Sequence, residues 1–259
     1  MSADALYCRA ADLVLGAHHL VALTGAGVST PSGIPDFRSP DSGLWNRVNP
    51  FLAASIYAFR IRPRLFFDWI RPLARTILDA APNPAHLALA QLEQMGRLKT
   101  VITQNIDNLH QKAGSTHVIE LHGNMRHATC MRCRRSMPTA PLIPRFLTAG
   151  EIPRCDRCGG VIKPDVILFG EQLPRQEVNA ARAAAKACDV MLVLGSSLTV
   201  APAADLPTMA CDNGAQVIVI NRQGTGIDDR AALTIRDDVA IALPDIVARV
   251  AHGAQAPLE

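Results

Sequence analysis

The stretch HLVALTGAG, residues 19–27, decides the fold of this chain of 259 residues. An apolar run typical of a buried strand ends in Gly25 and Gly27, which are the first two glycines of the pattern G-x-G-x-x-G. Such a turn lets backbone N–H groups approach the pyrophosphate of a dinucleotide. The sixth position is Thr30, and Pro31 follows where a helix should open. The stretch therefore predicts a nucleotide-binding turn that continues into an irregular loop.

Short runs rich in Val, Ile and Leu alternate with longer amphipathic stretches along the rest of the chain. The runs lie at residues 19–25, 98–103, 116–123, 189–195, 216–221 and 232–235, and we expect helices at 4–17, 84–96, 174–187, 201–213 and 238–251. Continuous apolar strands that alternate with helices predict a parallel sheet covered on both faces. The expected fold class is therefore α/β, with a Rossmann-like parallel sheet.

Two stretches break this alternation. Residues 31–80 are rich in aromatic residues, arginine and proline, and residues 124–162 carry clustered cysteines. We interpret both as insertions that together make a smaller lobe. The Rossmann-like domain then consists of residues 1–30, 81–123 and 163–259.

Composition and charge exclude several classes of partner. The net charge is +3 and no long block of one sign occurs, so no nucleic-acid partner is expected. The first residues lack the pattern of a secretory signal. Apolar runs such as VMLVLG are far shorter than the roughly 20 residues that span a bilayer. We predict a cytoplasmic protein without a membrane partner.

Two C-x-x-C pairs are the strongest local signal. The pairs are Cys130 with Cys133 and Cys155 with Cys158. Four thiolates with this spacing fill a tetrahedral shell, so we expect one structural Zn²⁺ ion. His127 as a replacement ligand and a nucleic-acid-binding zinc module are weaker alternatives.

Three further cysteines have no partner at ligand spacing. Cys8, Cys188 and Cys211 are interpreted as small buried hydrophobic residues.

Polar residues follow the ends of several predicted strands. Gln104, Asn105, Asp107 and His110 follow one strand and His122 follows the next, whereas Ser196-Ser197 and Asn221-Arg222 follow two later strands. Ligands of open α/β sheets bind beyond the carboxyl ends of the strands, so these groups would converge on one crevice. A hydride-transferring dehydrogenase is disfavoured, because position 45 is a tryptophan, Asp41 lies inside the irregular insert with no second strand before it, and no Tyr-x-x-x-Lys relay is present.

Several motifs together resemble the sirtuins, the NAD-dependent protein-lysine deacylases. They are GAGVSTPSGIPDFRSP, TQNIDNLHQKAG, ELHGN, the paired C-x-x-C motifs, KPDVILFGE, GSSLTVAPAADLP and VIVINR, in this order between about residues 20 and 240. The resemblance implies that residues 31–80 are a cofactor loop with a helical module and that residues 124–162 are a zinc-ribbon-like module. NAD and an acylated lysine would enter the cleft between the lobes.

The resemblance also implies the binding residues. NAD would contact Gly25, Ala26, Gly27, Thr30, Asp36, Phe37, Arg38, Gln104, Ile106, Gly195, Ser196, Ser197, Asn221, Arg222, Asp238 and Val239. The acylated protein or peptide would pair as a strand between two segments, with contacts at Val166, Ile167, Phe169, Gly170, Leu198 and Val200. In strand addition, main-chain bonds supply affinity and demand little of the sequence.

The catalytic residues implied by the resemblance are His122, Asn105 and Asp107. Asp107 would help to expel nicotinamide while the acyl oxygen attacks the ribose. His122 would act as general base on the ribose hydroxyl that attacks the imidate, and Asn105 would position ribose or water. The products would be free lysine, nicotinamide and O-acyl-ADP-ribose.

Three positions depart from the family pattern. The Tyr-x-x-Arg pair of sirtuins that prefer acidic acyl groups is missing, although Phe67 and Arg71 offer an imperfect echo, so acetyl is favoured. Asn108 stands where the family often has Gly or Arg. Lys163 stands where many members have Arg.

Two other functions remain open. The chain could transfer one ADP-ribose to protein, or it could bind acyl-lysine or ADP-ribose without catalysis. Neither the protein substrate nor the oligomeric state follows from the sequence.

Overall fold

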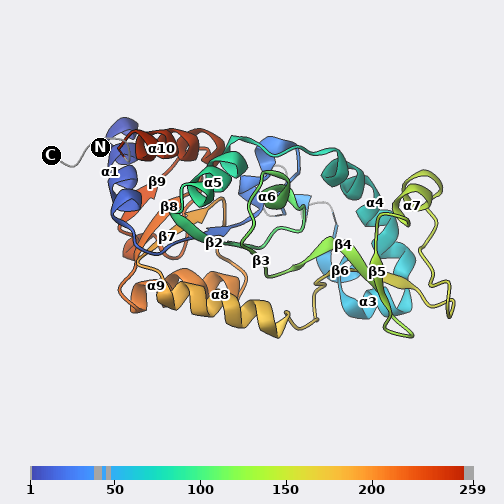
Figure 1. Cartoon of the computed structure of the whole chain (residues 1–259). Helices are drawn as coiled ribbons and strands as arrows, with labels where there is room; N and C mark the ends of the chain where they lie inside the picture. The colour runs from blue at the N-terminus through green and yellow to red at the C-terminus, as the bar shows by residue number, and fades with distance from the viewer. Residues whose placement is uncertain (1, 38–42, 45–47, 254–259) are drawn as a thin grey trace.

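The computed structural model describes residues 2–37, 43–44 and 48–253 (Figure 1). Its larger part contains a six-stranded sheet in the order β3-β2-β1-β7-β8-β9. The strands are β1 (Leu20–Thr24), β2 (Leu98–Thr103), β3 (Val118–Glu120), β7 (Val190–Leu194), β8 (Gln216–Ile220) and β9 (Leu233–Ile235). All neighbouring pairs are parallel, which confirms the predicted sheet.

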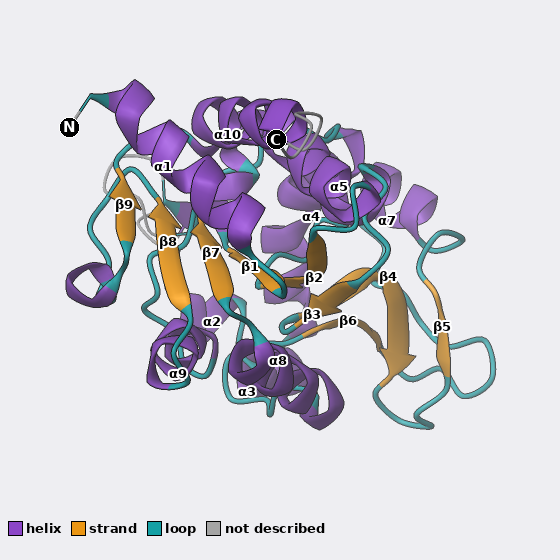
Figure 2. Cartoon of the chain, turned by 60° about the vertical axis from the view of Figure 1, so that its left-hand side comes forward, coloured by secondary structure: helices purple, strands orange, loops and turns teal. Residues whose placement is uncertain are grey.

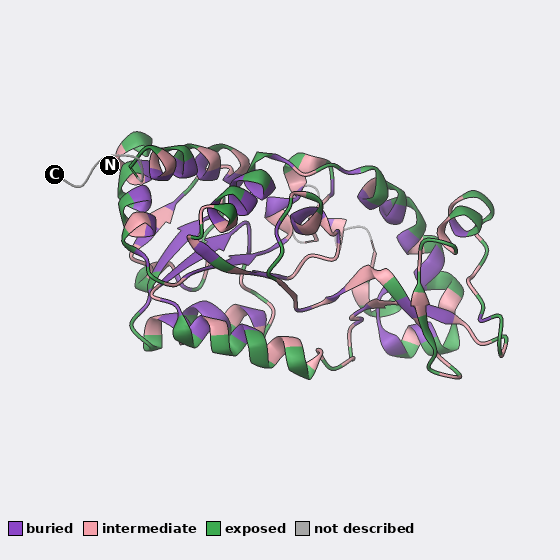
Figure 3. Ribbon diagram, in the orientation of Figure 1, coloured by how far each residue is buried: buried purple, intermediate pink, exposed green. Residues whose placement is uncertain are grey.

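Helices cover both faces of this sheet (Figures 1 and 2). One face packs against α1 (Ala3–Gly16), α5 (Pro84–Gln94) and α10 (Val239–Gly253), and the other packs against α8 (Arg175–Ala187) and α9 (Leu206–Asp212). The five predicted helices are thus confirmed. Figure 3 shows the sheet buried between the two layers, with the outer helix faces exposed. Burial on both faces explains why every residue of β1 and β7 is buried.

The strand order reverses at β1. The chain runs from β1 to β2 and β3 on one side, and it later returns to place β7 on the other side. Such a switch point leaves a crevice beyond the carboxyl ends of the two central strands. Short 3₁₀ turns follow β1, at η1 (Ala26–Val28) and η2 (Thr30–Ser32).

The smaller lobe combines a helical layer with a second sheet. The antiparallel sheet has the order β5-β4-β6, with β4 (Gly123–Cys130), β5 (Ser136–Pro138) and β6 (Ile162–Val166). The helices are α2 (Pro50–Ala53), α3 (Ile56–Ile61), α4 (Pro63–Asp79) and α7 (Ile143–Ala149). The predicted domain boundary at residue 163 falls inside β6, which pairs with β4 of the small sheet.

Aromatic rings hold the helices of this lobe together. The Phe59 and Phe66 rings lie 5.3 Å apart, and the Phe67 and Phe146 rings lie 5.5 Å apart with edges toward faces. Such pairs contribute about 0.5–1.5 kcal/mol beyond their buried area. The aromatic content of residues 31–80 therefore builds a core.

The remaining short elements are α6 (Leu109–Lys112), η4 (Ala203–Asp205) and η5 (Asp228–Arg230). No helix among residues 2–37, 43–44 and 48–253 combines the length and apolar character needed to cross a membrane.

The interpretation of the three isolated cysteines is correct only in part. Cys188 is buried, as predicted, but Cys211 is half-buried and Cys8 is exposed. Cys8 lies on the outer side of α1, where its thiol accepts a hydrogen bond from the Arg249 side chain.

Candidate active site

The glycine turn after β1 packs directly on the turn after β7. The N–H of Gly27 donates to the oxygen of Gly195 at 2.8 Å, and a Cβ added to Gly25 would meet the same oxygen at 2.8 Å. Gly195 itself has a φ of 55° and leaves no room for a side chain beside Val28. These glycines are therefore required by the contact between two backbone turns, in addition to any contact with a phosphate.

Ser29 is the buried centre of the polar site. Its hydroxyl donates to Oδ2 of Asp107 at 2.7 Å and accepts from Nδ2 of Asn105 at 3.1 Å. Because the single hydroxyl proton goes to Asp107, Nε2 of His86, at 3.5 Å, faces Ser29 as a donor. Sequence reasoning missed Ser29, although it lies inside the broken glycine motif.

Asp107 is held by two hydrogen bonds on the floor of the site. Its Oδ2 accepts from Ser29, and its Oδ1 accepts from the N–H of Leu109 at 2.9 Å. Burial raises the pKa of Asp107 above the ordinary carboxyl value, against the opposing effect of these hydrogen bonds. Each oxygen keeps a second lone pair with which it can accept from a bound amide.

Asn105 faces the same centre with its amide nitrogen. Its Nδ2 donates to the oxygen of Gly25 at 3.0 Å and to Ser29, which uses both amide protons. The Oδ1 atom is left as an acceptor for a hydroxyl or a water.

His122 lies at the link between the two sheets. Its Nδ1 is 2.9 Å from the backbone oxygen of Gln104, and because a carbonyl only accepts, Nδ1 carries the proton in this contact. In the neutral ring Nε2 is then the basic nitrogen. The side chain of Gln104 donates to Oγ of Ser196 at 2.9 Å, which ties this loop to the end of β7.

Two buried histidines, His86 and His110, lie beside the polar site. The His86 and His110 rings lie 4.9 Å apart, and Nε2 of His110 is 3.0 Å from Oγ1 of Thr24. Burial lowers the pKa of His86 to about 4 and that of His110 to about 3. Both rings are thus neutral at pH 7. The sequence placed His110 in the polar turn, but nothing in it indicated His86.

The residues predicted on the adenosine side also come together. Arg222 follows β8, Asp238 precedes α10, and their side chains form an ion pair at 2.6 Å. Val239 begins α10 and is buried, whereas Ser197 is exposed and Asn221 is half-buried. This pair joins the two segments that would face an adenosine.

The predicted cofactor loop is described only in part. Thr30 donates through its hydroxyl to the oxygen of Gly27 at 3.0 Å. Asp36 and Phe37 are half-buried, and Ala26, Gly27 and Ile106 are half-buried as well. Arg38 lies outside the described residues.

The predicted peptide segments lie beyond β6 and β7. In the first segment the N–H groups of Ile167, Leu168 and Phe169 donate to the His122 oxygen, the Glu171 side chain and the Ala54 oxygen. A substrate strand would therefore have to use other main-chain groups of this segment. In the second segment Leu198 has a φ of 49°, so residues 197–200 are not extended throughout.

Lys163 holds the first of these predicted peptide segments in place. This buried side chain donates to the oxygens of Pro164 at 3.0 Å and Val166 at 2.8 Å. It also forms an ion pair with Oε2 of Glu171 at 3.0 Å. All three ammonium protons therefore have acceptors within the segment that leads from β6 to Glu171.

The four predicted metal ligands converge in the small lobe. The Sγ atoms of Cys130, Cys133, Cys155 and Cys158 all lie within 4.8 Å of one another. The distances are 3.5 Å between Cys130 and Cys158 and 3.8 Å between Cys133 and Cys155. Sulfurs about 2.3 Å from a Zn²⁺ ion lie about 3.8 Å apart in a tetrahedron, so the cluster fits one zinc with no open position. His127 is exposed and is not part of this group.

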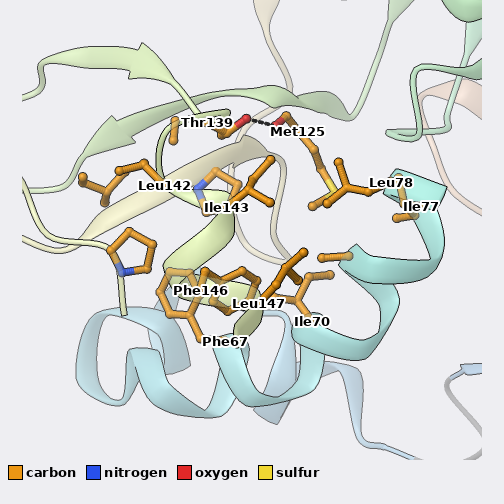
Figure 4. Close-up of a pocket in the computed structure, with 15 residues that line it drawn as sticks. Phe67, Ile70, Ile77, Leu78, Met125, Thr139, Leu142, Ile143, Phe146 and Leu147 are labelled. Carbon is orange, nitrogen blue, oxygen red and sulfur yellow. Dashed lines mark hydrogen bonds between the residues drawn. The ribbon is translucent and has the colours of Figure 1, made fainter. Parts of the chain in front are cut away.

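A separate apolar pocket lies between α4, α7 and β4 (Figure 4). Phe67 and Ile70 of α4 and Phe146 of α7 lie on one side of it, and Met125 of β4 lies on the far side. Arg71 instead lines an open hollow on another side of α4, together with Asp68, Arg75 and Asp79. Phe67 and Arg71, the imperfect echo of a Tyr-x-x-Arg pair, therefore line two different hollows.

Comparison with known proteins identifies the family. Residues 25–202 match the model of the Sir2 family. The NAD-dependent protein deacetylase of Sulfolobus acidocaldarius is 45% identical over 242 residues, which cover 93% of this chain and 94% of that protein.

Solved structures agree with this match. One, described as the structural basis for the mechanism and regulation of Sir2 enzymes, has a TM-score of 0.90 and 43% identity, covering 96% of this chain and 99% of that one. Another, a Sir2 protein with a p53 peptide and NAD⁺, has a TM-score of 0.83 and 40% identity, covering 94% and 96%. The sirtuin motifs, the fold and these matches agree, and the chain belongs to the Sir2 family.

Proposed function

We propose that this protein is an NAD-dependent protein-lysine deacylase that favours acetyl groups. The observation that carries the proposal is the way in which the loop after β2 holds three predicted groups together: Asp107 and Asn105 meet at Ser29 in the turn after β1, and His122 contacts the backbone oxygen of Gln104. A deacetylase at 45% identity and a Sir2 structure that holds both peptide and NAD⁺ support it.

NAD would bind across the switch point of the sheet. The close glycine contact brings the backbone of the turns after β1 and β7 to one place, where a pyrophosphate would sit. The Arg222–Asp238 pair would border the adenosine, and the buried floor at Asp107 would lie under the nicotinamide. NAD is consumed as a co-substrate, so this site must release nicotinamide in every cycle.

Each catalytic side chain is oriented for one task. The bond from Nδ1 of His122 to the Gln104 oxygen makes Nε2 the basic nitrogen, which would take a proton from a ribose hydroxyl. Oδ1 of Asn105 can accept from ribose or water, because both protons on its Nδ2 are already donated. The remaining lone pairs of Asp107 can accept from the nicotinamide amide and help it to leave.

The zinc has a structural role in this proposal. Four cysteines fill its shell and leave no position for a substrate or a water. The zinc would hold β4, which begins directly after His122, against the rest of the small lobe.

The acyl preference follows from the small lobe. Phe67 and Arg71 line different hollows, so they would not bind an acidic acyl group together. A neutral acyl group is therefore expected. The cytoplasmic location expected from the sequence stays a prediction, which cell fractionation would test.

One reaction tests the proposal. The protein is incubated with an acetylated peptide and NAD, and the peptide mass and released nicotinamide are followed together. Equal amounts of deacetylated peptide and nicotinamide are expected. Nicotinamide release with an ADP-ribosylated peptide would instead identify a mono-ADP-ribosyltransferase, and no release of either product would leave only a binding function.

A further inference from the structure

Arg126 links two catalytic segments that belong to different strands. It lies on β4, and its guanidinium donates to both oxygens of Glu120, at 2.8 Å from Nη1 and 2.6 Å from Nη2. Nη1 also donates to Oδ1 of Asn108. One side chain thus spans the end of β3 and the loop that follows β2.

Glu120 is the anchor of this arrangement. It is the last residue of β3 and precedes His122 by two positions. Its carboxylate also accepts from Nε2 of Gln111 at 2.9 Å and from Nδ2 of Asn124 at 3.1 Å. The Glu120 side chain is only 12% exposed, so a carboxylate with four donors is held in one place.

Asn108 is the other end of the link. It follows Asp107 directly and has a φ of 65°, a left-handed conformation that asparagine tolerates better than most residues. The next residue begins α6. The Asn108 side chain therefore has a role that glycine could not fill at this left-handed position, because its Oδ1 accepts a hydrogen bond from the Arg126 guanidinium.

The β4 strand explains why Arg126 can reach both partners. Its pairing with β6 is irregular between Gly123 and Ala128, so Arg126 lies in the displaced part of the strand. The N–H of Arg126 donates to Oδ1 of Asn124 at 3.0 Å, and its oxygen accepts from Thr139. The backbone that carries the guanidinium is thereby fixed on both sides.

We propose that Arg126 is a positioning residue for the deacylation reaction. It holds the loop of Asn105 and Asp107 in a fixed place relative to the turn of His122, through Asn108 on one side and Glu120 on the other. This inference rests on the proposed function. Because these side chains act on opposite parts of one reacting group, a small displacement between them is costly: about 1 Å can cost about 10²-fold in rate.

The first test compares Arg126→Met with Arg126→Lys and with the control Arg230→Met. Arg230 forms a single exposed ion pair with Asp212, away from the site. We expect Arg126→Met to lower kcat about tenfold, with KM for NAD changed less than twofold, and Arg126→Lys to recover part of the loss. Arg230→Met should keep the kcat of the wild type. Assays are run well below the melting temperature of each variant.

The second test is a double-mutant cycle with Asn108→Gly, which keeps the left-handed backbone and removes the acceptor. Its loss of kcat should nearly vanish in the Arg126→Met background, because both changes break one link. Asn108→Asp keeps the acceptor and should recover at least half of the kcat that Asn108→Gly loses.

The outcomes separate the hypotheses. Unchanged kcat in Arg126→Met, or additive losses in the cycle with a lower melting temperature, would overturn the positioning role. If Arg126→Met does not fold, Asn108→Gly decides alone, and a wild-type kcat in that variant overturns the role. An inactive wild type would instead contradict the proposed function.

Discussion

The Nδ1 nitrogen of His122 lies 2.9 Å from the backbone oxygen of Gln104. This contact fixes the tautomer of the ring, since the carbonyl can only accept a proton. The loop that carries Asn105 and Asp107 therefore also determines which nitrogen of His122 is basic.

His122→Ala should lower kcat by about 10²-fold to 10⁴-fold, because it removes the general base and leaves the other polar groups in place. The exposed His127, five residues further along the same part of the chain, provides the control variant His127→Ala. Deacetylation is followed by peptide mass, and circular dichroism checks the fold. Full activity in His122→Ala would contradict the role of the base.

His86→Gln should reduce the dependence of stability on pH. The pKa of His86 falls to about 4 on folding from an ordinary value of about 6.5. The unfolded chain therefore binds this proton first, and stability decreases as the pH falls from about 6.5 to 4, by about 1.4 kcal/mol per unit. The lowered pKa of His110 adds a further loss of stability as the pH falls. The raised pKa of Asp107 acts in the opposite direction, because the folded chain binds that proton more readily than the unfolded chain, and this effect is limited to one proton.

Urea unfolding of wild type and His86→Gln at several pH values measures this difference. Protonation of the zinc thiolates affects both proteins equally and cancels. The exposed His252 provides the comparison variant His252→Gln, measured under the same conditions. Identical slopes in wild type and His86→Gln would show that His86 is protonated equally in both states.

Cys130→Ala should abolish stoichiometric zinc and destabilise the small lobe. A four-cysteine zinc can contribute about 10–16 kcal/mol in small modules, so losing one ligand in this buried cluster is severe. Metal content is measured by atomic absorption and stability by thermal unfolding. The exposed Cys8 gives the matched control Cys8→Ala, which should retain the zinc. A zinc content near one per chain in Cys130→Ala would refute the four-cysteine site.

Lys163→Met should destabilise the protein by about 3 kcal/mol, because it leaves the half-buried Glu171 carboxylate and two carbonyl oxygens without their cation. It should also raise KM for the peptide more than it lowers kcat, since the predicted peptide segment follows Lys163. Lys163→Arg keeps the charge and should lose less than half as much stability. Unfolding in urea and steady-state kinetics measure both effects. An unchanged KM for the peptide in Lys163→Met would show that this ion pair has no part in peptide binding.

The alternation of apolar runs and amphipathic stretches was sufficient to predict the parallel sheet and its helices. Buried strands such as β1 have a continuous apolar pattern that few other structures share. The order of the strands was not predictable from periodicity, because pairing between β1 and β7 joins residues that are far apart in the chain.

The site was predictable where a motif carried it and not where packing built it. The cysteine spacing indicated the metal cluster directly, because ligand number and geometry limit the possible arrangements. Ser29 and His86 were missed, since a buried serine and a buried histidine have no spacing that distinguishes them from ordinary core residues. Cys8 was predicted to be buried on its residue type alone, and its position on the outer side of α1 decided otherwise.

The position of His122 between two sheets has a mechanical consequence. β3 of the parallel sheet ends at Glu120 and β4 of the small sheet begins at Gly123, so only Leu121 and His122 separate the two lobes along this part of the chain. Any rotation of one lobe about this link displaces the distant tips of the lobes most and the histidine least. If the lobes rotate about this link, the predicted catalytic base keeps its place while the distant parts of the lobes move apart.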